Sequence, residues 1–290
     1  MTAPLPVIIL LISSVGWGLT WIPLDYLGHI GVDGPLLILI AFGGAAILLF
    51  PMLMKQRQQW MPSWQWLLLI FIFGGFANMA FQASLYHGEV IRVMILFYLL
   101  PVWGVLGGRI FLGEHIDRLR VFAVILALGG AFLILDGPQI FEKPPSWIDM
   151  LAIASGFAFA MNNLVFRFAQ EIPVASKVSA MFVGAVLFIA IYLFGYSSGT
   201  INITATGAGL TLVYGIFWLT LITFGTQWGV TRLEAGRASI IIVMELVAAV
   251  ISAVILLPES LEYLEVIGIM MVISAALLEG LREGVTTAAT

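Results

Sequence analysis

The stretch QASLYHGEVIRVMILFYLLPVWGVLGGRIFLGEHIDRL, residues 82–119, is repeated in outline by QWGVTRLEAGRASIIIVMELVAAVISAVILLPESLEYL, residues 227–264. Apolar residues match easily by chance between two hydrophobic segments, whereas polar residues do not. At an offset of 145 residues and without a gap, the alignment pairs Gln82 with Gln227, Glu89 with Glu234, Arg92 with Arg237, Glu114 with Glu259, and Leu119 with Leu264. The sequence therefore predicts two related halves.

The amino-acid composition indicates that both halves lie in a membrane. Of the 290 residues, 61% are hydrophobic and 10% are charged, whereas soluble domains are roughly 45–50% apolar and about 25% charged. The apolar runs are continuous over about 20 residues, the length of a membrane-spanning helix, and do not alternate over about 10 residues as barrel strands do. We expect an all-α membrane protein with ten transmembrane helices, near residues 5–26, 35–54, 64–86, 91–112, 119–135, 148–168, 178–196, 210–232, 239–257 and 263–281.

The two halves are expected to insert in opposite directions. The longest polar connection, GPQIFEKPPS at residues 137–146, divides the chain into a first five-helix repeat, residues 1–140, and a second, residues 141–290. An odd number of helices in each half inverts the second copy relative to the first. Inverted repeats are typical of carriers that open one central cavity to either side of the membrane in turn.

Basic residues indicate the orientation, because Lys and Arg accumulate on the cytoplasmic side. An N-terminus inside the cell places ten of the twelve basic residues at cytoplasmic helix ends and leaves only Arg92 and Lys143 outside. The first apolar run lacks the charged n-region and the A-x-A-like cleavage site of a signal peptide, so it is predicted to be a retained helix. We expect a multi-pass protein of the inner or plasma membrane, in contact with the lipid bilayer, with both termini cytoplasmic.

Several classes of function are disfavoured by what the sequence contains. The net charge is −4 and the basic residues are scattered, so we expect no nucleic-acid partner. There is no cysteine, and His29, His87 and His115 lie in separate joints without metal-ligand spacing. We therefore expect no metal, no cofactor and no enzyme activity, although an intramembrane enzyme or a scaffold remains a rival interpretation.

Three motifs resemble a known family. They are WGLTW at residues 17–21, LLPVWGVLGGRIFLGE at residues 99–114 and ILLPESL at residues 255–261. Together with the ten-helix plan they resemble the drug/metabolite transporter superfamily, EamA type, and the chain is similar in length to aromatic amino acid exporters of the YddG type. The resemblance implies a central cavity lined by helices 1, 3, 4, 6, 8 and 9. The second half departs from the motif, because Pro101 aligns with Leu246 and Glu245 lies beside it.

Polar residues inside the predicted spans are the first candidates for substrate binding. Asn78 and Gln82 lie four residues apart and hence on one helix face, and Gln227 repeats Gln82 in the second half. Asn162 and Asn163 occupy the position that Trp17 and Gly18 hold in the first half. Amide side chains both donate and accept hydrogen bonds, so they suit a polar substrate group. The alternative is that these amides only join helices to one another.

Glu245 is the sharpest single candidate, and Trp17 and Tyr98 are the aromatic ones. A carboxylate within a membrane span usually marks an ion path, a proton relay or a counter-charge for substrate. The alternative for Glu245 is a structural partner such as Arg237. Trp17 and Tyr98 could stack on an apolar or cationic substrate, or serve only in packing.

The leading functional expectation is a monomeric secondary transporter of a small-molecule metabolite, which exports amino acids, neutral or aromatic ones among them, by alternating access. The alternative is a carrier of a cationic amine or drug-like compound, with Glu245 as its counter-charge or as a proton carrier.

Overall fold

The computed structural model describes residues 5–32, 34–142, 144–196, 204–257 and 261–282. Predictions made for Lys143 and Glu259 lie outside this part. In the first half the helices are α1 (Leu5–Gly18), α2 (Trp21–His29), α3 (Gly34–Lys55), the short α4 (Arg57–Trp60) and η1 (Met61–Ser63), α5 (Trp64–His87), α6 (Val90–Phe97), α7 (Leu100–Leu112), α8 (Arg118–Ile134) and the short η2 (Gly137–Phe141). In the second half they are α9 (Trp147–Phe168), α10 (Val174–Tyr196), α11 (Ala205–Val213), the π-helical η3 (Tyr214–Leu219), α12 (Thr220–Arg232), α13 (Ala235–Ile242), α14 (Met244–Leu256) and α15 (Tyr263–Gly280).

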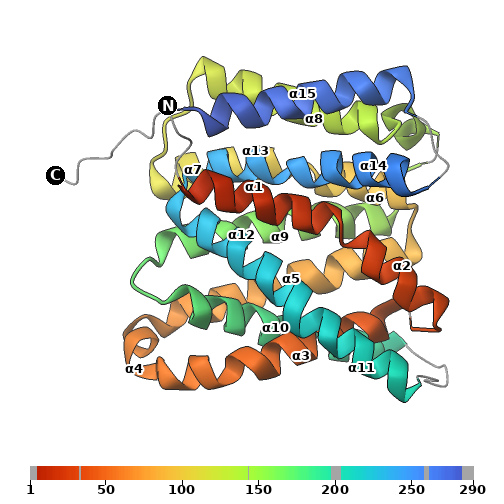
Figure 1. Ribbon diagram of the computed structural model, residues 1–290. Helices are drawn as coiled ribbons and strands as arrows, with labels where there is room; N and C mark the ends of the chain where they lie inside the picture. The colour runs from red at the N-terminus through yellow and green to blue at the C-terminus, as the bar shows by residue number, and fades with distance from the viewer. Residues whose placement is uncertain (1–4, 33, 143, 197–203, 258–260, 283–290) are drawn as a thin grey trace.

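These helices form ten spans, which confirms the predicted fold class. Nine segments of the described chain are long and apolar enough to cross a membrane. The tenth, α8, has 17 residues and runs alongside α15 (Figure 1). From one edge of the molecule to the other, α8 and α15 are followed by α6, α7, α13 and α14, then by α1, α5, α9 and α12, and last by α3 and α10 (Figure 1).

The inverted repeat is visible in the helix boundaries. α5 ends at His87 and α12 at Arg232, and these residues are 145 positions apart. The same offset separates the first residue of α6 from that of α13, and the first residue of α8 from that of α15. The first two spans of each half do not keep this offset, so the helix boundaries do not support the pairing of Trp17 and Gly18 with Asn162 and Asn163.

Two expected helix starts were wrong because a basic residue was assigned to a loop. Helix α10 begins at Val174 rather than at 178, and it contains the fully buried Lys177. The ammonium of Lys177 donates to the carbonyl oxygens of Phe166 and Ala169, each at 2.8 Å, at the end of α9. Similarly, α13 begins at Ala235 and contains the buried Arg237. Cations at a helix C-terminus satisfy carbonyls that have no partner within the helix.

Four spans are irregular near their middle. The first is interrupted between α1 and α2, the fourth between α6 and α7, and the ninth at Val243 between α13 and α14, while the eighth contains the π-helical η3. Pro101 in the first turn of α7 explains the interruption in the fourth span. Irregular backbone at membrane depth is tolerated only where protein or a water-filled cavity surrounds it. The irregular spans therefore indicate where to look for a site.

A cluster of charged residues joins α8, α13 and α15 at the end of the molecule where the chain termini lie (Figure 1). Its centre is Arg120, which is only 1% exposed and pairs with Glu234 and with the equally buried Glu279. Glu114 accepts hydrogen bonds from the backbone N–H groups of Ala235, at 2.7 Å, and Gly236, at 3.2 Å, where α13 begins. We call Glu114, Arg120, Glu234 and Glu279 the Arg120 cluster.

Two carboxyl groups in the loop before α8 have shifted pKa values. Burial raises the pKa of Glu114, against the lowering effect of its two backbone hydrogen bonds. For Asp117, burial acts in the raising direction, but the backbone N–H of Arg120 and the guanidinium of Arg282 outweigh it and lower the pKa. Asp117 also caps α8, because its side chain accepts from the backbone N–H of Arg120 at 2.8 Å.

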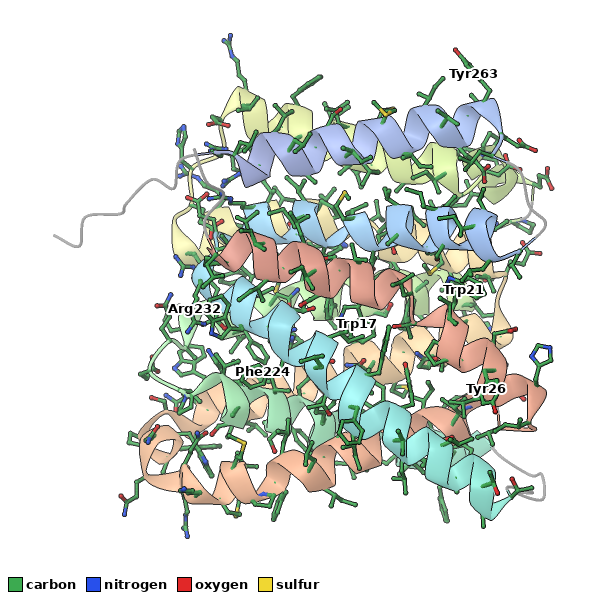
Figure 2. All side chains as sticks on the ribbon, in the orientation of Figure 1. Trp17, Trp21, Tyr26, Phe224, Arg232 and Tyr263 are labelled. Carbon is green, nitrogen blue, oxygen red and sulfur yellow. The ribbon has the colours of Figure 1, made fainter. Side chains whose placement is uncertain are left out.

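The two ends of the molecule differ in their side chains. Arg232 lies at the end of the chain termini, whereas Tyr26 and Tyr263 lie at the opposite end (Figure 2). Both tyrosines are exposed. Exposed tyrosines at a span terminus are typical of the membrane interface, where an amphipathic ring lies between lipid and water.

Candidate functional site: a cavity between the two halves

A cavity of about 120 Å³ lies between the two halves. All four irregular spans contribute to its wall, together with α3, α5, α9 and α10. Its aromatic lining residues are Trp17, Phe42, Phe81, Phe97, Phe159 and Tyr214, and its polar lining residues are Ser14, Thr20, Asn78, Gln82, Thr223, Thr226, Gln227 and Glu245. The cavity is therefore mostly apolar, with a few polar groups that converge on it, as is usual for small-molecule sites.

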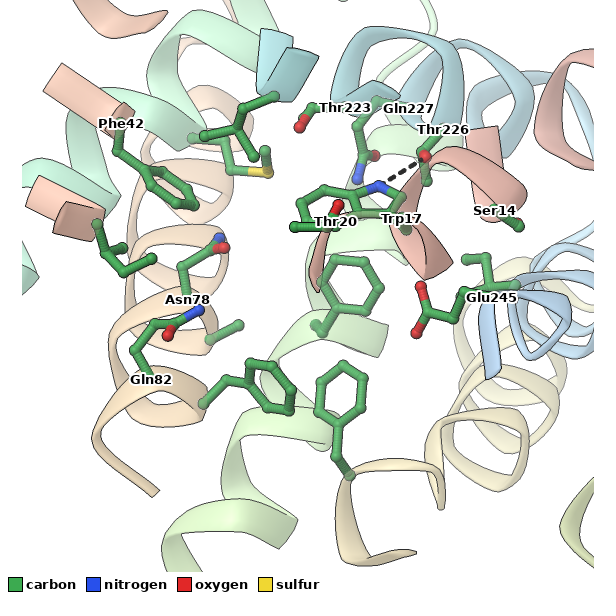
Figure 3. A pocket seen from close by; sticks show the side chains of 18 of the residues that line it. Ser14, Trp17, Thr20, Phe42, Asn78, Gln82, Thr223, Thr226, Gln227 and Glu245 are labelled. Carbon is green, nitrogen blue, oxygen red and sulfur yellow. Dashed lines mark hydrogen bonds between the residues drawn. The ribbon is translucent and has the colours of Figure 1, made fainter. Parts of the chain in front are cut away.

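An aromatic wall occupies one part of the cavity. The rings of Phe81 and Phe97 are 4.5 Å apart between centroids, and those of Phe97 and Phe159 are 6.0 Å apart. Trp17 lies between polar groups from several helices, and its indole N–H donates to the hydroxyl of Thr226 at 3.2 Å (Figure 3). These rings offer a surface on which an apolar or cationic group can stack.

Glu245 is the only acidic or basic side chain among the described residues that line the cavity. It lies in the first turn of α14, where the positive end of the helix dipole favours an anion. The sequence predicted one unbroken helix over residues 239–257, whereas the ninth span is interrupted at Val243, two residues before Glu245. Tyr98, at the interruption between α6 and α7, donates its hydroxyl to Glu245 Oε1 at 2.9 Å.

The backbone around Glu245 is closely packed. A Cβ atom built on Gly18 of α1 would clash with the carbonyl oxygen of Glu245, so only glycine permits this approach. Arg237, the alternative partner, donates instead to the carbonyl of Gly280 at 2.9 Å. The carboxylate is thus held between the two halves, with its hydrogen bond to Tyr98 crossing from one half to the other.

Amide side chains form a second polar group. Asn163 Oδ1 accepts from Gln227 Nε2 at 3.2 Å and from Asn162 Nδ2 at 3.3 Å. Asn78 Nδ2 donates to the carbonyl of Gly74 at 2.7 Å. Gln227, with Thr223 and Thr226, lies on a different side of the cavity from Asn78 and Gln82 (Figure 3).

A model of the EamA-like transporter family matches residues 4–136 and again residues 146–279, once in each half. This chain belongs to the EamA-like transporter family. It is therefore a multi-pass membrane transporter of small molecules. No curated protein matches the sequence of this transporter significantly. A solved crystal structure matches its fold with a TM-score of 0.79 over 97% of this chain and 99% of the other, at 16% sequence identity.

The predicted site residues of this EamA-like transporter fall into two groups. Five line the cavity, namely Trp17, Asn78, Gln82, Gln227 and Glu245. The other three lie behind the wall: Tyr98 and Asn163 bond to the lining residues Glu245 and Gln227, and Asn162 bonds to Asn163. The sequence did not distinguish residues that line the cavity from residues that lie behind its wall.

Other lining residues of the transporter were not singled out from the sequence. Phe81 shares a helix face with Asn78 and Gln82, so helical spacing could have identified it. Phe42 of α3 and Met181 of α10 also line the cavity, although the family resemblance implied only helices 1, 3, 4, 6, 8 and 9. Both residues lie in strongly apolar helices, in which a cavity face and a lipid face have the same composition.

Proposed function

We propose that this protein is an alternating-access carrier of a small organic amine. The ammonium group of the amine binds Glu245, and its apolar or aromatic body packs against the aromatic wall. The observation that carries the proposal is a single carboxylate in a cavity without a basic lining residue in the described chain. An unpaired charge within the membrane is costly, so a substrate of opposite charge is the natural partner.

The charge of the cavity favours an amine over a zwitterionic amino acid. The carboxylate of an amino acid would need a cationic partner, and no Lys, Arg or His is among the described residues that line the cavity. The indole N–H of Trp17 already donates to Thr226, and the amide nitrogens of Asn78 and Gln227 donate to Gly74 and Asn163, which leaves only neutral groups such as Gln82 and Thr223 for a carboxylate. Export of aromatic amino acids stays the second candidate, because the same rings would accept the side chain of such a substrate.

Alternating access is supported by the matching interruptions of the fourth and ninth spans. The interruptions lie at equivalent positions of inverted halves, and each provides a point at which its span can bend. The cavity is lined by helices from both halves of the chain, and we propose a monomer as the transporting unit.

Exchange in liposomes tests the substrate class. Phenethylamine and phenylalanine differ only in the carboxylate. In phenylalanine methyl ester this carboxylate is replaced by an uncharged ester. We expect purified protein to catalyse saturable counterflow of phenethylamine and of the ester, and to exchange phenylalanine at least about tenfold more slowly, since an uncompensated charge costs well over 1.4 kcal/mol. Faster exchange of phenylalanine than of phenethylamine would contradict the amine proposal, and chemical conversion of the recovered amine would point to an enzyme.

We also infer that the end of the molecule with the chain termini faces the cytoplasm. Ten of the twelve basic residues belong to helix ends or loops on that side. A reporter that is active only in the cytoplasm should be active when it is fused after Thr290. Activity of a reporter that works only outside the cytoplasm would reverse the assignment.

A further inference from the structure

One threonine of α12 differs from the others. The hydroxyls of Thr220, Thr226 and Thr231 donate to backbone carbonyl oxygens of the same span, at 2.9, 2.9 and 2.7 Å respectively. Such bonds are the usual way in which a helix satisfies a threonine hydroxyl. Thr223 is only 2% exposed, yet its hydroxyl has no partner within the described structure. It lies in the first turn of α12, which follows directly after η3, and π-helical turns are frequent at functional sites.

Gln227 lies one helical turn beyond Thr223, on the same face of α12. Its amide nitrogen is committed to Asn163, while its amide oxygen is buried and has no partner among the described residues. Both residues line the cavity, where they lie close together above Trp17 (Figure 3). Unpaired buried polar atoms are rare in native proteins, because each has given up its water. Two of them on one face of a cavity point to a ligand group.

The corresponding positions of the first half are not equivalent. Asn78 corresponds to Thr223 and Gln82 to Gln227 at the offset of 145 residues. The amide nitrogen of Asn78 is bonded to Gly74 of its own helix. Thr223 and Gln227 are also both almost fully buried, whereas Asn78 and Gln82 are only partly buried. Among the described residues, the pair of buried polar groups without partners is therefore found only in the second half.

We propose that Thr223 and Gln227 form a second recognition point, which accepts a hydrogen bond from an O–H or N–H group of the substrate. The substrate class is then an amine that carries a further hydrogen-bond donor, rather than a purely hydrocarbon ammonium ion. Asn163 acts as a positioning residue, because its hydrogen bond with Gln227 keeps the amide oxygen free. This inference rests on the proposed function, in which the ammonium group binds Glu245.

Matched pairs of amines test the second recognition point. Tyramine differs from phenethylamine by one hydroxyl, and 6-aminohexanol differs from hexylamine in the same way. For the wild-type protein we expect a hydroxylated amine to bind about fivefold more tightly than its partner in at least one pair, since a net hydrogen bond is worth roughly 0.5–1.5 kcal/mol. The dissociation constants are measured by calorimetry on the purified full-length protein.

Variants of α12 locate the effect. Thr223→Val removes the hydroxyl at nearly constant volume, and Gln227→Leu removes the amide. We expect each to reduce the hydroxyl preference, which is the ratio of the dissociation constants of the two amines of a pair, at least about twofold. Thr231→Val is the matched control, because Thr231 does not line the cavity and its hydroxyl bonds to the backbone carbonyl of Gln227 rather than to the side chain, so this variant should keep the preference.

The outcomes separate this inference from the proposed function. Equal affinities within both pairs, or a preference that persists in Thr223→Val and in Gln227→Leu, would overturn the second recognition point. If the amines nevertheless bind in a Glu245-dependent manner, the proposed function stands. If no amine binds, both proposals fail together.

Discussion

Glu245→Gln is expected to abolish counterflow of phenethylamine, with a loss of affinity of about 100-fold or more. The substitution removes the only charge among the described cavity residues and keeps the volume of the side chain. An amide oxygen can still accept the hydrogen bond from Tyr98. Loss of one partner of a buried ion pair costs about 3–5 kcal/mol, which corresponds to more than a hundredfold change in affinity.

Binding of phenethylamine to purified protein and counterflow in liposomes are the two measurements for this variant. Tyr98→Phe serves as the control, because it removes the hydroxyl next to Glu245 and leaves the carboxylate in place. We expect Tyr98→Phe to retain amine binding within about tenfold, the cost of one hydrogen bond. Counterflow by Glu245→Gln at the wild-type rate would exclude Glu245 as the site of the ammonium group.

Arg120→Leu is expected to destabilise the fold by about 3–5 kcal/mol, because it removes the buried cation that pairs with both Glu234 and Glu279. Glu279 is only 1% exposed, and Arg282 is its remaining neighbour of opposite charge among the described salt bridges, at 3.4 Å. The measurement is the midpoint of thermal or denaturant-induced unfolding in detergent, which should fall clearly below that of the wild-type protein.

Two further variants define this effect. Arg118→Leu removes an exposed arginine from the first turn of the same helix and should leave the midpoint unchanged. Combining Arg120→Leu with Glu279→Leu removes both buried charges, and it should recover part of the lost stability. Equal midpoints for Arg118→Leu and Arg120→Leu would show that the Arg120 cluster does not hold α8, α13 and α15 together.

The ten spans and their inverted relation could be predicted because both leave patterns that can be read from one sequence without an alignment. The length of each apolar run identifies a membrane span. The repeat is identified by polar residues, because matches to Gln82, Glu89 and Arg92 rarely arise by chance between apolar segments. Glu245 could be singled out as a candidate site residue for a similar reason, because a carboxylate is unusual within an apolar run.

Other features depended on contacts between distant segments. Lys177 was assigned to a loop because a lysine is costly in lipid, yet the carbonyls at the end of α9 stabilise it within α10. The interruption at Val243 has no proline to indicate it. Whether an asparagine such as Asn162 faces the cavity or lies behind its wall is decided by neighbouring helices, and no local pattern records that difference.

The solitary charge of Glu245 has an electrical consequence for the proposed carrier. A carboxylate paired with an ammonium ion is neutral, so the loaded protein changes conformation without moving net charge through the membrane potential. With Glu245 ionised, the empty protein returns with a negative charge at its centre. Each elementary charge that crosses 100 mV corresponds to about 2.3 kcal/mol. The voltage across the membrane therefore acts on the return of the empty carrier rather than on the passage of its cargo, and it sets the direction in which an amine accumulates.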